Sequence, residues 1–145
     1  MKGMLESMPF YFWVNSMSVA QLQSRHLILF DLDGTLVDSA ADLYRAMNLS
    51  LEKLQLPLVT EEQVRAWVGK GAAKLCETVL EHIFGQVNTE QQTQLLDTFV
   101  DIYAQELCVN TQVYTGILPF LDYCQSHNMV MACVTNKPKH LAKGI

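Results

Sequence analysis

Two short apolar runs, each followed directly by a polar loop, constrain the fold of this chain most strongly. The first run covers residues 26–30 and ends at Asp31, and the second covers residues 129–134 and ends at Thr135. A continuous apolar run with a turn signal behind it is typical of a strand buried on both faces of a parallel sheet. Ligands of such sheets bind beyond the carboxyl ends of the strands, so both loops are expected to face one crevice. The sequence therefore predicts an α/β fold with its site at that edge.

The segment between the two runs has the periodicity of helices. Apolar residues recur at three- and four-residue spacing, and start and stop signals divide the segment. Four helices are expected, beginning after Ser39, at the capping box Thr60–Gln63, at Ala72, and after Asn88 or Thr89. A fifth, short helix is expected around residues 118–123, with Pro119 tolerated in its first turn. The four helices are expected to fold over the crevice as a lid.

Composition narrows the class of protein and its partners. The chain has 145 residues and a net charge of -5, which suits one domain with an insertion and argues against a nucleic-acid partner. The apolar patch at residues 10–14 is too short to span a membrane, so no membrane partner is expected. The four cysteines show no C-x-x-C spacing and are interpreted as packing residues. A cytoplasmic location follows as the default.

Residues 1–24 form an N-terminal extension ahead of the first strand. They lack the long apolar run and small-residue cleavage site of a signal peptide. The expectation is either a disordered leader or a start placed too early, with Met17 as the true first residue.

The loop after the first strand carries the residues with the clearest chemistry. Asp31 and Asp33 can share a divalent cation through hard oxygen ligands, or divide the roles of nucleophile and proton shuttle. Gly34 permits a tight turn, and Thr35 offers a hydroxyl. An EF-hand calcium loop does not fit, because its glycine stands at position six and a helix precedes it. A plain Asx turn is the remaining alternative for a bare D-x-D-G string.

The longer string around these residues resembles a known family. Residues 29–39, LFDLDGTLVDS, resemble the first motif of the haloacid-dehalogenase-like hydrolase superfamily, and residues 134–138, VTNKP, resemble the second. Residues 68–72, VGKGA, resemble the cap loop of its phosphoglycolate phosphatase branch. The resemblance covers residues 25–145. It implies a Rossmann-like core from residues 25–40 and 114–145, with an α-helical type 1 cap at residues 41–113.

The resemblance also implies a role for each matching residue. Asp31 is the nucleophile that forms an aspartyl-phosphate, and Asp33 protonates the leaving oxygen and then activates water. Asp31 and the backbone carbonyl of Asp33 hold Mg²⁺. Thr135 and Asn136 bind the phosphoryl oxygens. Lys70 contacts the organic part of the substrate, a small phosphorylated metabolite for which 2-phosphoglycolate is favoured; otherwise it is a solvated charge.

Two further motifs of the superfamily, a lysine and one or two carboxylates, lie tens of residues beyond the second. The core is therefore expected to be truncated after its second strand, with an incomplete parallel sheet and little or no turnover. Residues considered as replacements are expected to lie in the wrong place: Lys137, Lys139 and Lys143 for the lysine, Asp38 and Asp42 for the carboxylates. Alternatives are a non-catalytic remnant, a fragment that complements another chain, and a related phosphomutase or phosphonate hydrolase. The sequence predicts no oligomeric state.

Overall fold

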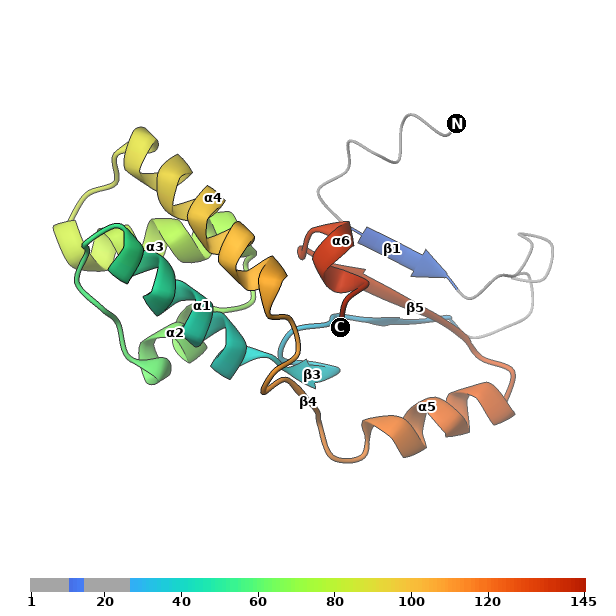
Figure 1. Cartoon of the computed structure of the whole chain (residues 1–145). Helices are drawn as coiled ribbons and strands as arrows, with labels where there is room; N and C mark the ends of the chain where they lie inside the picture. The colour runs from blue at the N-terminus through green and yellow to red at the C-terminus, as the bar shows by residue number, and fades with distance from the viewer. Residues whose placement is uncertain (1–10, 15–26) are drawn as a thin grey trace, which may run out of the picture.

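The computed structural model describes residues 11–14 and 27–145, and it separates into a helical part and a part built on a small sheet (Figure 1). The helical part contains α1 (Ala40–Lys53), α2 (Glu61–Trp67), α3 (Ala72–Phe84) and α4 (Thr89–Gln105). The sheet part contains β1 (Tyr11–Val14), β2 (Leu27–Phe30), α5 (Ile117–Ser126), β5 (Val130–Thr135) and α6 (Lys139–Ala142). This is the mixed α/β architecture that the sequence predicts.

The sheet has the strand order β1-β5-β2. β2 and β5 run parallel, with Leu29 opposite Ala132, which confirms the parallel pairing of the two apolar runs. β1 pairs antiparallel with the other edge of β5, so the sheet is mixed. This strand lies within the extension that we expected to be disordered, and its Tyr-Phe-Trp-Val sequence has high strand propensity. The rest of that extension lies outside the described residues.

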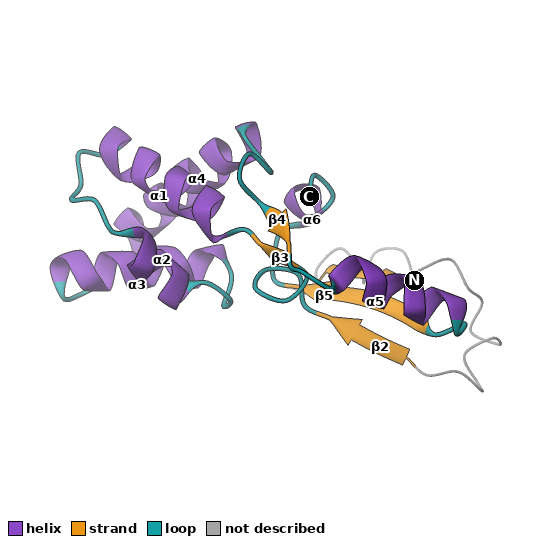
Figure 2. Cartoon of the chain, turned by 90° about the horizontal axis from the view of Figure 1, so that it is seen from below, coloured by secondary structure: helices purple, strands orange, loops and turns teal. Residues whose placement is uncertain are grey.

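β2 is less buried than a strand covered on both faces. Leu27 is 50% exposed and Leu29 is 56% exposed, whereas Phe30 is buried. Figure 2 shows α5 lying along β5 and β2, and the Phe30 and Phe120 rings meet edge to face with centroids 6.2 Å apart. β2 is one of the two edge strands of the described sheet. The expected burial on both faces is therefore wrong for Leu27 and Leu29.

The four helices begin and end close to the predicted signals. Thr60 and Gln63 form the capping box, in which the Thr60 hydroxyl accepts from the Gln63 amide and the Gln63 side chain accepts from the Thr60 amide. The Asn88 side chain caps α4, and Gly85 ends α3 in the left-handed region. Their apolar faces share one buried cluster that includes Met47, Leu51, Val64, Leu75, Val79, Leu80, Leu95, Phe99 and Tyr103. We call α1–α4 the cap.

Two short strands that the sequence does not predict join the cap to the sheet part. β3 (Val37–Asp38) pairs antiparallel with β4 (Gln112–Val113), with Val37 opposite Val113. The two connections between cap and sheet therefore run side by side and are hydrogen-bonded to each other (Figure 1). Of the described helices, none is both long and apolar enough to cross a membrane. The four cysteines are unpaired. Cys76 and Cys124 are buried, as expected of packing residues, whereas Cys108 is exposed and that interpretation is wrong for it.

Candidate active site

The loop after β2 is a tight turn that places two carboxylates at the end of the strand. The Leu32 carbonyl accepts hydrogen bonds from the amides of Thr35, Leu36 and Val37. Gly34 has φ +82°, a left-handed conformation that glycine adopts at little cost. The Asp31 carboxylate accepts from the Leu32 amide at 2.8 Å. Both Asp31 and Asp33 line one small cavity of about 50 Å³.

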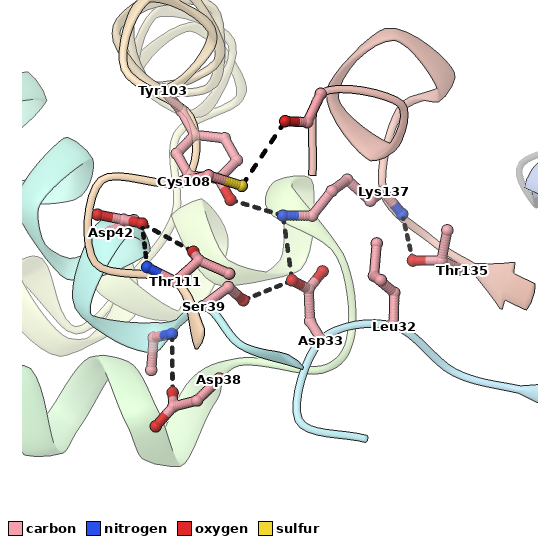
Figure 3. A network of polar contacts seen from close by, with 12 residues as sticks. Leu32, Asp33, Asp38, Ser39, Asp42, Tyr103, Cys108, Thr111, Thr135 and Lys137 are labelled. Carbon is pink, nitrogen blue, oxygen red and sulfur yellow. Dashed lines mark hydrogen bonds and ion pairs between the residues drawn. The ribbon is translucent and has the colours of Figure 1, made fainter. Parts of the chain in front are cut away.

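The loop after β5 contributes the opposite wall of this cavity. Thr135 ends the strand and is buried, and its hydroxyl accepts from the Lys137 amide at 3.1 Å (Figure 3). Thr135 and Asn136 line the same cavity as the two aspartates. Parallel pairing of β2 and β5 brings their carboxyl ends together. Four of the five predicted site residues therefore meet at one place.

The cap closes the cavity with the loop between α2 and α3. Gly69 and Gly71 line the cavity, and a Cβ atom added to Gly71 would lie 3.4 Å from the Asn136 Cβ atom. Lys70 is exposed and lines a neighbouring, more open hollow together with Asn136 and Pro138. The structure thus places the Lys70 backbone beside the cavity without making its side chain part of the lining. Its contact with a substrate stays a prediction.

Lys137 and Tyr103 complete the site and were not predicted from the sequence. Lys137 Nζ lies 3.1 Å from Asp33 Oδ1 and 2.7 Å from the Tyr103 hydroxyl (Figure 3). The expectation that Lys137 lies on the wrong loop is therefore wrong, because the turn after Thr135 directs its side chain back to Asp33. The alternation of side chains along a strand does not continue past its last residue, so it cannot predict where Lys137 points. The Thr135 hydroxyl was the available signal, because threonine hydroxyls often accept a backbone hydrogen bond in turns.

Burial shapes the protonation of these two groups. It lowers the pKa of Lys137 below the ordinary value of a lysine, and the Asp33 carboxylate beside it acts in the opposite direction. Burial also raises the pKa of Tyr103, and the charges of Asp33 and Asp42 add to that rise. Tyr103 is therefore a neutral phenol that can accept a hydrogen bond from the Lys137 ammonium.

Ser39 occupies the N-cap position of α1, but its side chain does not cap the helix. Its hydroxyl donates instead to Asp33 Oδ1 at 2.5 Å. The Asp33 carboxylate thus receives Ser39 and Lys137 on the same oxygen. Ser39 was predicted as a cap, and its contact with Asp33 could not be read from helix signals alone.

The two aspartates considered as additional metal ligands are engaged elsewhere. Asp38 pairs with Arg65 of α2, with both carboxylate oxygens 2.9 Å from Nη1. Asp42 accepts hydrogen bonds from Asn110 and Thr111. Among the described residues no group of three His, Cys, Asp or Glu side chains can hold a metal ion. Asp31 and Asp33 still offer the oxygen ligands that Mg²⁺ prefers, and Mg²⁺ commonly binds through one or two carboxylates together with water and substrate phosphate.

Comparison with known proteins places this chain in a family. The family model described as "Haloacid dehalogenase-like hydrolase" matches residues 28–144. The chain belongs to that family. The match includes both loops, the cap and α6, so all the site residues described above lie within it.

The two relatives reported for this haloacid dehalogenase-like chain are both described as phosphoglycolate phosphatases. It is 38% identical to a phosphoglycolate phosphatase of Mannheimia succiniciproducens over 116 residues, covering 77% of this chain and 52% of the relative. It is 42% identical to a phosphoglycolate phosphatase of Pseudomonas savastanoi pv. phaseolicola over 115 residues, covering 78% of this chain and 42% of the relative. The chain spans about half the length of these relatives.

A solved structure shows the same fold. A crystal structure described as a predicted phosphoglycolate phosphatase from Haemophilus somnus superposes with a TM-score of 0.72 at 30% identity. The superposition covers 81% of this chain and 54% of that protein. The fold of this chain is therefore shared with that protein over most of the described residues.

Proposed function

We propose that this chain carries the nucleophile and phosphate-binding half of a magnesium-dependent phosphatase that hydrolyses a small phosphate monoester, with 2-phosphoglycolate as the preferred substrate. The observation that carries the proposal is the convergence of Asp31, Asp33, Thr135 and Asn136 on one small cavity under the cap. The names of the relatives support the choice of substrate. A small cavity favours a small substrate, since a bulky alcohol portion would have to displace the cap loop.

The reaction divides into two displacements at phosphorus. In the first, a carboxylate oxygen of Asp31 bonds to phosphorus while the bond to the ester oxygen breaks, and Asp33 gives a proton to that leaving oxygen. In the second, Asp33 takes a proton from water, whose oxygen bonds to the phosphorus of the aspartyl-phosphate. Inorganic phosphate leaves, and Asp31 regains its carboxylate. Asp33 thus regains in the second step the proton that it gave up in the first, and both aspartates end in their starting states.

The remaining groups bind and orient the phosphoryl group. The Thr135 hydroxyl and the Asn136 amide donate hydrogen bonds to its oxygens, and Lys70 contacts the organic part of the substrate at the mouth of the cavity. The Asp31 carboxylate and the Asp33 backbone carbonyl would hold Mg²⁺, which supplies positive charge beside the phosphoryl oxygens. Because phosphate-monoester hydrolysis is among the slowest uncatalysed reactions, even modest turnover would require such charge stabilisation.

The proposal is tested with 2-phosphoglycolate labelled with ³²P and the purified chain in MgCl₂. Because the sequence predicts little or no turnover, we expect only slow phosphate release and, after rapid acid quenching, label on the protein. Asp31→Asn replaces the nucleophilic carboxylate with a poorly nucleophilic amide and should lower both the phosphate release and the label by at least about 10³-fold. Asp122→Asn is the matched control, because Asp122 is an exposed carboxylate on α5, away from the cavity.

Two results would count against the proposal. If the wild-type chain neither releases phosphate nor carries more label than Asp31→Asn, the chain is not a phosphatase. If a phosphate monoester with a much larger alcohol portion is hydrolysed with the same kcat/KM as 2-phosphoglycolate, the preferred substrate is wrong.

A further inference from the structure

One buried ammonium group connects three parts of the molecule that are distant in sequence. Lys137 Nζ lies between Asp33 of the β2 loop and Tyr103 of α4, which is the last helix of the cap (Figure 3). The side chains of Lys137 and Asp33 are 5% and 16% exposed. Tyr103 is 1% exposed. A charge held out of water in this way requires specific partners, so these contacts define its position.

The geometry at Lys137 assigns its donors. An ammonium group has three N–H donors. One faces Asp33 Oδ1 at 3.1 Å and another faces the Tyr103 hydroxyl at 2.7 Å. Nζ also lies 4.5 Å from the centroid of the Tyr103 ring, within the range of a cation–π contact. Both contacts with Tyr103 therefore hold the ammonium beside Asp33.

The Asp33 carboxylate is constrained on one oxygen. Ser39 and Lys137 both contact Oδ1, at 2.5 and 3.1 Å. Within the described part of the chain, neither Ser39 nor Lys137 contacts Oδ2. Rotation of the carboxylate would break two charge-assisted contacts at once, so Oδ2 is the oxygen left for exchange of a proton with the substrate.

Tyr103 is itself held firmly by the cap. Its ring stacks on Phe99 with an interplanar angle of 2° and centroids 5.9 Å apart. Both rings belong to the buried cluster of the cap helices. The hydroxyl can reach Lys137 only while α4 sits against the loop after β5. A displaced cap would remove one of the two close polar partners of the ammonium.

We propose that Lys137 is a positioning residue for Asp33, and that Tyr103 makes this positioning depend on the seating of the cap. The catalytic meaning of the inference rests on the proposed function, whereas the linkage of Tyr103 to Asp33 does not. Asp33 would be aligned for proton transfer only when the cap covers the cavity and excludes water. Closure of the cap would thereby be coupled to proton transfer through Tyr103, Lys137 and Asp33.

The linkage is tested by ¹³C NMR of the whole chain labelled at the aspartate carboxyl carbons, with Asp33→Ala used to assign the Asp33 resonance. Tyr103→Phe deletes one oxygen and keeps the ring, and it should shift the Asp33 resonance although Tyr103 makes no direct polar contact with it. Lys137→Met should shift it further, and Lys137→Arg should restore part of the shift. Tyr44→Phe and Lys143→Met are the controls, and they should leave the resonance unchanged.

Kinetics supply the second readout. We expect Tyr103→Phe to lower kcat about 10-fold and Lys137→Met about 10²-fold, each with little change in KM, because proton transfer and not binding is affected. An Asp33 resonance that stays at its wild-type position in Tyr103→Phe overturns the inference, even if Lys137→Met does not fold. Wild-type chain without phosphate release, but with the expected shifts, overturns the proposed function and leaves the linkage standing.

Discussion

At the scale of single residues, Asp42 shows how a buried charge is used away from the site. It lies near the start of α1 and is fully buried. Its carboxylate accepts hydrogen bonds from the amides of Asn110 and Thr111 and from the Thr111 hydroxyl, at 2.7–3.0 Å. Burial alone would raise the pKa of Asp42, but the hydrogen bonds from Thr111 and Asn110 outweigh it and hold that pKa below 3.8. Asp42 therefore fastens the start of the cap to the segment that leaves it.

Asp42→Asn should lower the free energy of unfolding by about 2–3 kcal/mol at pH 7, because an amide group would face donors that need an acceptor. A carboxylate whose pKa is lowered by folding contributes stability that is present above its unfolded value of 3.8 and is lost as the pH falls through the folded value. The difference between wild type and variant should therefore shrink below pH 3.8. Urea unfolding followed by circular dichroism at several pH values measures it, with Asp97→Asn as control. A difference that stays constant down to pH 2 would contradict this assignment.

At the scale of elements, the contact between the cap loop and the β5 loop depends on one glycine. Gly71 has φ +87° and ψ 163°, a conformation found essentially only for glycine. A methyl group there would also come into contact with Asn136, whose Cβ atom lies 3.4 Å from the position of the added Cβ atom. Gly69 is the natural comparison, since it has φ +113° but faces open space.

Gly71→Ala and Gly69→Ala should each lower the free energy of unfolding by about 1–3 kcal/mol through backbone strain. Only Gly71→Ala should also move the amide resonance of Asn136 in a ¹H–¹⁵N spectrum, because only there does the new methyl group meet the β5 loop. Equal effects of both variants on the Asn136 resonance would show that the contact between Gly71 and Asn136 is not the cause.

The same scale shows what the sequence can predict and what it cannot. The helices of the cap carry complete local signals, such as the Thr60–Gln63 box and Gly85, so their positions follow from hydrogen bonds made within a few residues. Asp31 and Thr135 could be placed together because parallel strands bring their carboxyl ends to one edge. β3 and β4 have two residues each and are stabilised by pairing across the whole cap, which no local pattern reports. Lys137 was misplaced for a related reason, since its direction is set by a turn and by Tyr103 on a distant helix.

At the scale of the whole molecule, the two parts differ in how well they are covered. The cap encloses its own cluster of buried side chains, including residues from all four helices. In the sheet part, several large apolar side chains are exposed on β2 and α5, namely Leu27, Leu29, Leu118, Phe120 and Tyr123. β2 is also one of the two edge strands of the described sheet. An edge strand with exposed apolar side chains is a template for pairing with another chain.

We therefore expect the purified chain to self-associate through this edge, with an average mass that rises with concentration in sedimentation equilibrium. Leu29→Lys places a charge on the edge strand and should shift the distribution toward the monomer, because pairing would then bury or crowd the lysine. Leu58→Lys is the matched control, since Leu58 is 53% exposed in the loop between α1 and α2. If both variants reduce association equally, general surface charge is responsible. If neither does, the exposed face of the sheet part is not the surface through which the copies meet.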